Sequence, residues 1–568
     1  MSKYIADHIK KIIKTDDSGR FLFERPRWNK DSAFTLDERD LFDLHGLMPE
    51  KVENLKVQVE RAYDQYQNVQ GNISKNIFLN ALHDRNETLF YNLVVEHLEE
   101  MLPIIYTPTI GDAVKSFSRQ YRRNRGIYLN YSQMKDIPSI IQQHITPDIK
   151  MVIITDGEGV LGIGDWGVGG MDIAIGKLMV YIANSNINPS HVMPICLDVG
   201  TCNEDLISDP HYIGSKEQRV REDHYFEFID SIIATLTEIN PSLYIHFEDF
   251  GRMNARRVLD RYQKDHCTFN DDIEGTGLIA LATIMSATAK TKKSFTDHQF
   301  VILGPGSAGL GIADTLKNAL MKFGLSEQEA THRIWMVGKF GLLTQDHNIR
   351  YPDQRVYARK EKDLCEGEAL TLLETIKHVK PTVLIGCSGA FGSFNEDIIK
   401  TMYSYEKHPI IMPLSNPISC CEVTPLDALT WTEGNGLIAT GSPFDDVILN
   451  DKVYNIAQCN NAYIFPGLGQ GIIMSNAKKL TLKMLLAASE SLSHAWNTIK
   501  DKEGKNEYLL PPLNKGYQKI SFEISRAVAL QAIEDGVTDL SAESIDQAFK
   551  EISWDYQYYQ FSKLESDQ

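Results

Sequence analysis

Two pairs of acidic residues have the types and the spacing to hold a cation. The apolar run at residues 243–247 ends in Glu248-Asp249, and a second β-rich run ends in Asp271-Asp272. Carboxylate oxygens are the ligands that Mg²⁺ and Mn²⁺ prefer, and α/β proteins place such groups at the carboxyl ends of strands. The two pairs therefore predict a divalent-cation site, with helix capping as the alternative role for one member of the second pair.

A glycine-rich loop has the spacing of a dinucleotide cradle. The loop Gly304-Pro305-Gly306-Ser307-Ala308-Gly309 follows the apolar run 301–303 and precedes a predicted helix over 308–320. The first glycine allows the tight turn, the second lets the backbone approach a pyrophosphate, and the third lets the helix pack on the strand. The flanking strand and helix make the motif specific, because a glycine loop without them is common.

The end of the next predicted strand, 334–337, leaves the choice between NAD and NADP open. An acid at this place usually binds the adenosine ribose hydroxyls of NAD. Here the chain reads Gly338-Lys339. Lys339 either favours a 2′-phosphate or is simply a solvated lysine.

Several polar residues within apolar surroundings are ambiguous by themselves. Lys177 lies in an apolar helical pattern, where a lysine either snorkels to water or works with a lowered pKa. A tyrosine in an apolar run, such as Tyr106, is more often a core residue with a hydrogen-bonded hydroxyl than a catalytic acid. Asn416 and the pair Asn460-Asn461 adjoin apolar runs and are also compatible with plain turns.

The composition is that of a large, acidic globular chain. Its 568 residues exceed one hydrophobic core, so two to four domains are expected. The net charge of −18 argues against nucleic-acid binding, which needs clustered Lys and Arg. No apolar run has the length of a membrane span, and the eight cysteines include no C-x-x-C pair. These features favour a cytoplasmic protein without a zinc ribbon.

The pattern of elements predicts a multidomain α/β fold with largely parallel sheets. The expected strands are 151–155, 192–199, 243–247, 300–303, 334–337, 383–385, 410–412 and 437–439. We expect a helical N-terminal domain (1–125), a metal and substrate domain (126–270) with a return segment (461–530), a Rossmann-type NAD-binding domain (271–460) and a helical C-terminal tail (531–568). Isoleucines at 5, 9, 12 and 13 predict a surface helix at the N-terminus.

Taken together, these segments resemble the malic enzyme family over nearly the whole chain. The matching stretches are Ile105-Tyr106-Thr107-Pro108-Thr109, Thr155-Asp156-Gly157-Glu158, Gly162-Ile163-Gly164-Asp165, Ile175-Gly176-Lys177-Leu178, Phe247-Glu248-Asp249-Phe250, Phe269-Asn270-Asp271-Asp272, Leu414-Ser415-Asn416-Pro417 and Asn460-Asn461. Their order and separation argue against chance agreement.

The resemblance implies metal-dependent oxidative decarboxylation of L-malate to pyruvate and CO₂ with NAD, in a homodimer or homotetramer. By the family's pattern, Glu248, Asp249 and Asp272 would hold Mn²⁺ or Mg²⁺. Lys177, kept neutral by burial and by the cation, would take the hydroxyl proton of malate. Hydride would pass from C2 to the nicotinamide, CO₂ would leave, and Tyr106 would protonate C3.

The resemblance also assigns the remaining polar residues. Asp271 would lie near Lys177. Asn416 and Asn461 would hold the substrate carboxylate with Asn460 beside them. The cofactor would contact Asn416 and the loop residues Gly304, Gly306, Ser307, Ala308 and Gly309.

One departure from the family's pattern concerns malate itself. Many members have Arg directly after the acid of Thr-Asp-Gly-Glu, where it helps bind malate, whereas here Gly159 follows Glu158. This resembles the branch that holds malolactic enzymes and some bacterial NAD-linked malic enzymes. Malolactic enzymes use NAD and Mn²⁺ but form L-lactate and CO₂ without net redox change. We hypothesise that Arg125 or Arg252 replaces the missing contact.

The leading interpretation is an NAD-linked malic enzyme, which the segments 87–101 and 119–128 favour over the malolactic alternative. A catalytically silent NAD-binding regulatory protein is less favoured, because it would need neither Lys177 nor Tyr106. The sequence leaves allosteric effectors and the exact oligomeric state open.

Overall fold

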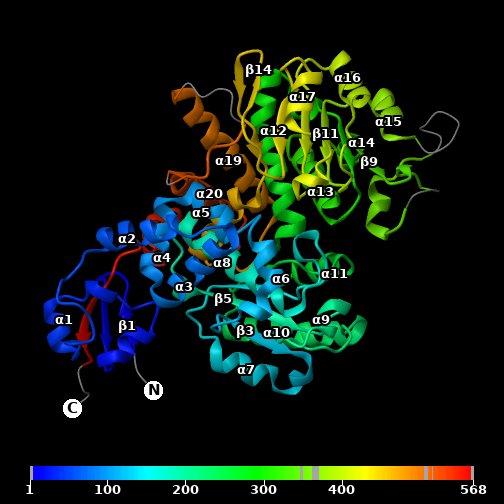
Figure 1. Ribbon diagram of the computed structural model, residues 1–568. Coiled ribbons are helices and arrows are strands. Elements are labelled where there is room, and N and C mark those ends of the chain that lie inside the picture. Colours follow the sequence, from blue (N-terminus) through cyan, green and yellow to red (C-terminus); the bar gives the residue numbers. More distant parts are fainter. Residues whose placement is uncertain (1–3, 346–348, 361–369, 504–508, 515, 565–568) are drawn as a thin grey trace.

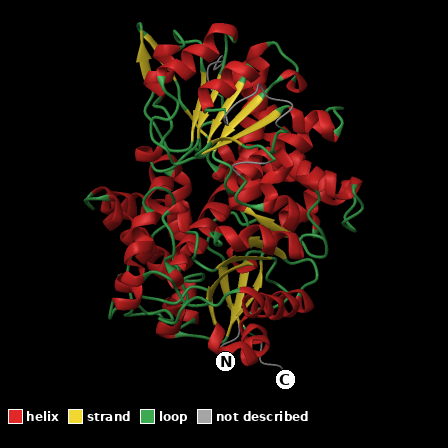
Figure 2. Ribbon diagram, turned by 90° about the vertical axis from the view of Figure 1, so that its right-hand side faces the viewer, coloured by secondary structure: helices red, strands yellow, loops and turns green. Residues whose placement is uncertain are grey.

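Two parallel β-sheets, one in the upper and one in the lower part of Figure 1, form the scaffold of the molecule, and helices fill the space between and around them (Figures 1 and 2). The computed structural model describes residues 4–345, 349–360, 370–503, 509–514 and 516–564. The predicted multidomain α/β fold is confirmed.

The first parallel sheet has the strand order β3-β5-β4-β6-β7. Its strands are β3 (Ile127–Asn130), β4 (Met151–Thr155), β5 (Val192–Asp198), β6 (Tyr244–Phe247) and β7 (Thr268–Asn270). The accompanying helices are α7 (Ile137–His144), α8 (Met171–Ser185), α9 (Glu204–Ser208), α10 (Glu222–Ile239) and α11 (Arg252–Tyr262). The central strands β4 and β6 are buried along their whole length, as expected for a parallel sheet covered on both faces.

The second sheet has the strand order β10-β9-β8-β11-β12-β13-β16, and its strands are parallel except β10. They are β8 (Phe300–Leu303), β9 (Ile334–Gly338), β10 (Gly341–Leu342), β11 (Val383–Gly386), β12 (Ile410–Pro413), β13 (Leu437–Thr440) and β16 (Ala457–Gln458). Their helices are α12 (Thr276–Thr291), α13 (Ser307–Lys322), α14 (Glu327–His332), α15 (Leu372–Val379), α16 (Glu396–Tyr405) and α17 (Pro425–Trp431). The strand order reverses at β8, and such a switch point is where Rossmann-type sheets bind dinucleotides.

Helices from both ends of the chain lie between and beside the sheets. They are α1 (Leu36–Leu41), α2 (Leu55–Gln67), α3 (Asn72–Arg85), α4 (Glu87–Glu96), α5 (Leu98–Ile105), α6 (Ile110–Gln120), α18 (Phe465–Ser475), α19 (Leu482–Glu503), α20 (Tyr517–Glu534) and α21 (Ile545–Ile552). Helices α18 and α20 pack on α8, so late segments of the chain cover the first sheet. Within the described residues, no helix combines the length and the apolar character that a membrane crossing requires.

The predicted surface helix at the N-terminus is wrong. Strands β1 (Tyr4–Asp7) and β2 (Ile12–Thr15) form an antiparallel hairpin, and β17 (Gln560–Lys563) pairs parallel with β2. The two ends of the chain therefore lie close together in Figure 1, and the expected helical tail ends in a strand. The isoleucines have helical spacing, and β17, the second pairing partner of β2, lies more than 500 residues away in the sequence. Sequence near the N-terminus therefore did not reveal the sheet.

Phe561 of β17 anchors this terminal sheet. Its side chain is 3% exposed and its ring centroid lies 5.7 Å from those of Phe34 and Phe42. We predict that Phe561→Ala destabilises the terminal sheet by about 3–5 kcal/mol, the usual cost of emptying a buried aromatic site. Urea unfolding with hydrogen exchange of residues 4–15 would measure this. Ile9→Ala, at a residue 72% exposed, is the matched control, and equal effects of the two changes would contradict the assignment.

Candidate active site

The three acids predicted to hold a cation meet at the carboxyl ends of two neighbouring strands. Glu248 and Asp249 directly follow β6, and the π-helical turn η7 (Asp271–Gly275), which contains Asp272, directly follows β7. One oxygen from each of the three acids lies within 4.8 Å of the other two. Such π-turns occur often at functional sites, since they redirect side chains out of the regular ladder.

The backbone around Asp249 is shaped to present its carboxylate. Its φ of +56° is unusual for a non-glycine residue and costs backbone energy. The amide of Asp249 donates to Oδ2 of Asp272 at 2.8 Å, and Oδ1 of Asp249 accepts from the amide of Leu161 at 3.0 Å. Within the described residues, the buried Oδ2 of Asp249 has no hydrogen-bond partner. An orphaned buried carboxylate oxygen among two further acids fits a bound cation.

Lys177 lies beside this acidic group. It projects from α8, is 1% exposed, and its Nζ lies 2.5 Å from Oδ2 of Asp271 and 2.8 Å from Oε1 of Glu248. The ammonium also lies 5.3 Å from the ring centroid of Tyr106 and 4.6 Å from that of Phe465. The structure thus brings together Lys177, Tyr106 and Asp271, as the sequence predicts.

Burial and ion pairing oppose each other at this lysine. Burial favours the neutral amine, but the carboxylates of Asp271 and Glu248 outweigh it and raise the pKa of Lys177 well above its usual value. A neutral Lys177 therefore needs the positive charge of a cation at the acids, and this expectation stays a prediction. Burial also raises the pKa of Glu248 to about 7 and that of Asp272 to about 8, and repulsion from neighbouring carboxylates adds to this effect.

His246 and Tyr181 support Glu248, and the sequence interpretation missed both. Nε2 of His246 lies 2.7 Å from Oε2 of Glu248, and Nδ1 lies 2.9 Å from the hydroxyl of Tyr181. Burial and the charge of Lys177 lower the pKa of His246 to about 3, so the ring is neutral and donates from Nε2. A histidine within the apolar run of β6 was the only signal in the sequence.

Of the three asparagines assigned to the substrate, one bonds to Asp271, the acid that pairs with Lys177. Nδ2 of Asn461 donates to Oδ2 of Asp271 at 2.8 Å. The side chain of Asn460 instead accepts from the amide of Ala462, at 2.9 Å. Asn416 follows β12 on the second sheet, where its Oδ1 accepts from Ser442 at 2.5 Å.

The glycine loop has the shape of a dinucleotide cradle. Gly304 has a φ of +107°, and a Cβ there would lie 2.4 Å from the carbonyl oxygen of Cys387. A Cβ on Gly309 would lie 2.1 Å from the carbonyl oxygen of Gly304. Beside Gly306, by contrast, the nearest atoms are those of the Arg252 guanidinium at 4.0 Å, which leaves space for a ligand. Helix α13 begins at Ser307 and contains Ala308 in its first turn.

The helix that follows the glycine loop packs against the turn that carries two of the acids. A Cβ on Gly311 of α13 would lie 2.1 Å from the carbonyl oxygen of Ile273, which sits between the acids of η7 and the helix α12. Helix α13 therefore rests directly on the turn that carries Asp271 and Asp272.

The structure explains the glycine that replaces arginine at position 159. A Cβ on Gly159 would lie 2.6 Å from the carbonyl oxygen of Phe250, so this backbone admits no side chain. Arg125 is held by Asp84 at 2.7 Å and by Asn80 at 3.0 Å. Arg252 donates to the carbonyl oxygen of Pro305 in the glycine loop, at 3.0 Å. Of the two arginines proposed as substitutes, only Arg252 therefore adjoins the cofactor loop.

Gly338, the last residue of β9, has room around it for a larger side chain. A Cβ on Gly338 would meet its nearest neighbour, Cγ of Pro305, at 3.5 Å. Lys339 next to it is exposed. The absence of the acid at position 338 therefore reflects the sequence and not a lack of space.

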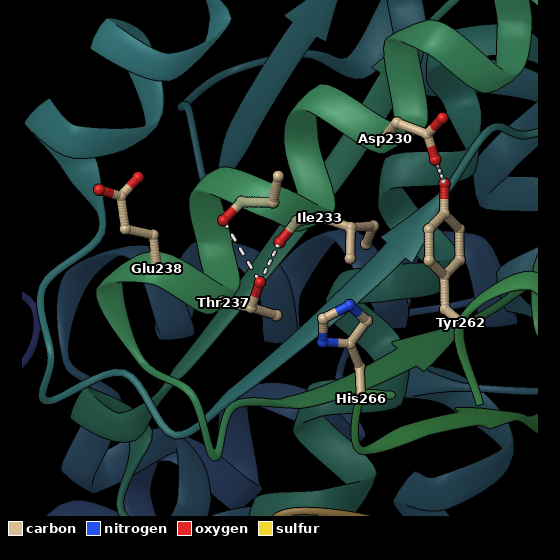
Figure 3. A pocket seen from close by; sticks show the side chains of 7 residues that line it. Asp230, Ile233, Thr237, Glu238, Tyr262 and His266 are labelled. Atoms are coloured by element: carbon tan, nitrogen blue, oxygen red, sulfur yellow. Dashed lines mark hydrogen bonds between the residues drawn. The ribbon is translucent and has the colours of Figure 1, made fainter. Parts of the chain in front are cut away.

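A surface hollow of about 540 Å³ lies away from these groups (Figure 3). It is lined by Asp230, Ile233, Ala234, Thr237, Glu238, Tyr262 and His266. Tyr262 donates to Asp230 at 2.6 Å, and Thr237 donates to its own helix. His266 precedes β7, so the hollow lies at the amino end of the strand whose carboxyl end carries the acids. The size of this hollow does not by itself identify it as the active site.

Comparisons with known proteins agree with this arrangement. The family described as "Malic enzyme, N-terminal domain" matches residues 83–263, and "Malic enzyme, NAD binding domain" matches residues 273–533. The chain is 44% identical over 551 residues to NAD-dependent malic enzymes from Escherichia coli strain K12 and strain HS, and the match covers 96% of this chain and 97% of each relative.

Solved structures share the fold at lower identity. A malic enzyme from Entamoeba histolytica matches with a TM-score of 0.52 and 22% identity, over 90% of this chain and 92% of that one. A malic enzyme from Pyrococcus horikoshii also has a TM-score of 0.52, with 20% identity over 80% of this chain and 89% of that one.

The orphaned oxygen of Asp249 leads to a test of cation binding. We predict that Asp249→Asn weakens Mn²⁺ binding by about 100-fold or more. Mutation of residues that only hydrogen-bond to metal ligands already lowers metal affinity by about 10–100-fold. Electron paramagnetic resonance of free Mn²⁺ during titration measures this without turnover. Asp223→Asn, at an exposed acid of α10, is the control. Equal Mn²⁺ affinities of the wild-type protein and Asp249→Asn would refute the metal assignment.

Proposed function

The chain belongs to the malic enzyme family, and on that premise we propose that its buried lysine and acids carry out oxidative decarboxylation of L-malate to pyruvate and CO₂ with NAD. The observation that carries the proposal is the contact of Lys177 with Asp271 and Glu248, beside two further acids. Oxidation at C2 needs a base, a cation and a hydride acceptor in one cleft, and these residues supply a place for each.

We propose that Glu248, Asp249 and Asp272 hold Mg²⁺ or Mn²⁺, because the ligand atoms of these three residues are all carboxylate oxygens. The cation supplies positive charge that polarises the C2 hydroxyl of malate and offsets the carboxylates that keep Lys177 protonated. NAD supplies the hydride acceptor, and Gly306 with the N-terminus of α13 offers the place for its pyrophosphate.

In this proposal Lys177 takes the proton of the C2 hydroxyl at Nζ. Asp271 orients the amine, since it accepts from both Lys177 and Asn461. After oxidation the 2-keto acid loses its C4 carboxylate as CO₂, and Tyr106 protonates C3 of the resulting enolate. Burial raises the pKa of Tyr106 above its usual value, which keeps the phenol protonated until the carbanion forms.

Product analysis tests the proposal. Purified protein would be incubated with L-malate and Mn²⁺, with NAD and NADP in parallel, and pyruvate, lactate and reduced nicotinamide would be measured together. We expect one NADH per pyruvate. The NADP reaction decides whether the missing acid at Gly338 relaxes the choice of cofactor.

The malolactic reaction is the second candidate, because a glycine at position 159 resembles the branch that holds malolactic enzymes and some bacterial NAD-linked malic enzymes. The backbone at Gly159 has no room for the arginine that helps bind malate in many family members. Lactate formed without net NADH would establish that outcome. Absence of both products despite NAD binding would support a silent NAD-binding protein.

Placement in the cell and assembly are part of the proposal. We propose a cytoplasmic protein, because the exposed thiol Cys202 suits a reducing compartment. We also propose a homodimer or homotetramer, since Phe21 and Leu36 offer exposed apolar surface. The division of the chain at about residues 125, 270, 460 and 530 stays a prediction.

The proposed roles of Lys177 and Tyr106 predict different losses. Lys177→Met should lower kcat by about 10²–10⁴, the usual contribution of a general base, in both directions of the redox step. Tyr106→Phe should abolish exchange of the C3 hydrogens of pyruvate with solvent while hydride transfer to oxaloacetate persists. Stopped-flow absorbance and NMR would separate the two steps. Equal loss of both steps in both variants would contradict the division of labour.

The position of Arg252 predicts a cofactor effect rather than a malate effect. Its guanidinium adjoins Gly306 and donates to Pro305, so Arg252→Ala should raise the KM for NAD about tenfold, as expected for a lost charged contact. The KM for malate should change less. Arg125→Ala, which removes the contacts to Asp84, is the comparison variant. A larger effect of Arg252→Ala on malate would instead support its role as the substitute carboxylate contact.

A further inference from the structure

A second buried carboxylate lies at the carboxyl edge of the NAD-binding sheet and has no part in the chemistry described above. Glu422 is 0% exposed and comes from the segment that follows β12. A Cβ on Gly386, the last residue of β11, would lie 2.5 Å from the carboxyl carbon of Glu422. The carboxylate is therefore wedged against the end of β11.

Two serines from two different loops hold this carboxylate. Oε1 accepts from the amide of Ser388 at 2.8 Å, from the hydroxyl of Ser388 at 2.9 Å and from the hydroxyl of Ser415 at 2.5 Å. The hydroxyl of Ser415 in turn accepts from the amide of Gly389 at 2.9 Å. Ser388 belongs to the loop after β11 and Ser415 to the loop after β12, so Glu422 fastens the two loops to each other.

A carboxylate held in the interior by these neutral donors costs desolvation energy. A serine, an asparagine or a water molecule could join two loops without burying a charge. Charged acceptors form stronger hydrogen bonds and set the direction of the groups that donate to them. The arrangement therefore gains a fixed loop geometry at the expense of stability, which is typical of functional sites.

The loops that Glu422 joins adjoin the glycine loop and carry Asn416. The carbonyl oxygen of Cys387, next to Ser388, packs against Gly304 of the glycine loop. Asn416 directly follows Ser415 and accepts from Ser442, beyond the end of β13. Exposed apolar side chains of Phe391 and Ile418 project from the same two loops, and such surfaces suit the flat ring of a nicotinamide.

We propose that Glu422 is a positioning residue for the nicotinamide half of the cofactor. Its carboxylate fixes the loops after β11 and β12 so that the ring faces the substrate and the amide of Asn416 is correctly placed. The inference deepens the proposed function and rests on the use of a nicotinamide cofactor at this edge.

Binding of NADH to the full-length protein, followed by nucleotide fluorescence without malate, tests the inference. Glu422→Gln keeps an acceptor oxygen but puts an amide donor among the donors of Ser388 and Ser415. We expect its Kd for NADH to rise about tenfold, equivalent to about 1.4 kcal/mol.

Glu406→Gln is the matched control. Glu406 is a buried carboxylate at the opposite edge of the same sheet, just before β12, where it pairs with Lys293. This variant should lower the melting temperature and leave the Kd for NADH unchanged. A Kd of Glu422→Gln within twofold of wild type, or a loss of NADH affinity of equal size in Glu406→Gln, would overturn the inference.

Ser415→Ala covers the case in which Glu422→Gln does not fold. It removes one donor to the carboxylate and one acceptor for Gly389, and it should weaken NADH binding in the same direction. Unchanged NADH binding in Ser415→Ala would also overturn the inference. A wild-type protein that binds NADH but does not oxidise malate would refute the proposed function alone, because the binding comparison would still stand.

Discussion

The structure depends on a buried excess of negative charge. Glu248, Asp249, Asp271 and Asp272 meet at one strand edge, and Lys177 is the cation that contacts two of them. Carboxylates this close in a dry site repel one another, which is why burial raises the pKa of Glu248 to about 7 and that of Asp272 to about 8. Such a group is costly alone and becomes favourable when a divalent cation joins it.

The fold brings these charged side chains together from separate layers. Parallel strands deliver two acids from β6 and two from the turn after β7, while α8 brings Lys177 from the helix layer. Because α13 rests on Ile273, the glycine loop cannot shift far without moving the acids of η7. Charge, cofactor cradle and substrate residues are therefore parts of one packed unit, although they come from two sheets.

The sequence predicted most strands and pointed to the acids that gather beside Lys177, because both leave local signals. Apolar runs mark β4, β6 and β8, and acids or glycines at their ends mark function. What failed depends on distant contacts. The terminal sheet includes the pairing of β2 with β17 from the other end of the chain, and the carboxylates that pair with Lys177 lie more than 70 positions away from it. His246 and Glu422 carry no local pattern that separates a supporting role from ordinary core or loop residues.

The two candidate products differ in a step that the acidic group does not control. Pyruvate and NADH arise together in the cleft, and lactate forms only when both stay long enough for hydride to return from NADH to C2 of the keto acid. In the roles proposed above, Lys177 and Tyr106 serve either course equally, since each step repeats a proton transfer assigned to them. If Glu422 positions the nicotinamide as proposed, retention of NADH depends on the loops after β11 and β12, which Glu422 holds together. On that proposal, the stability of these loops at the second sheet contributes to the choice between malic and malolactic outcomes.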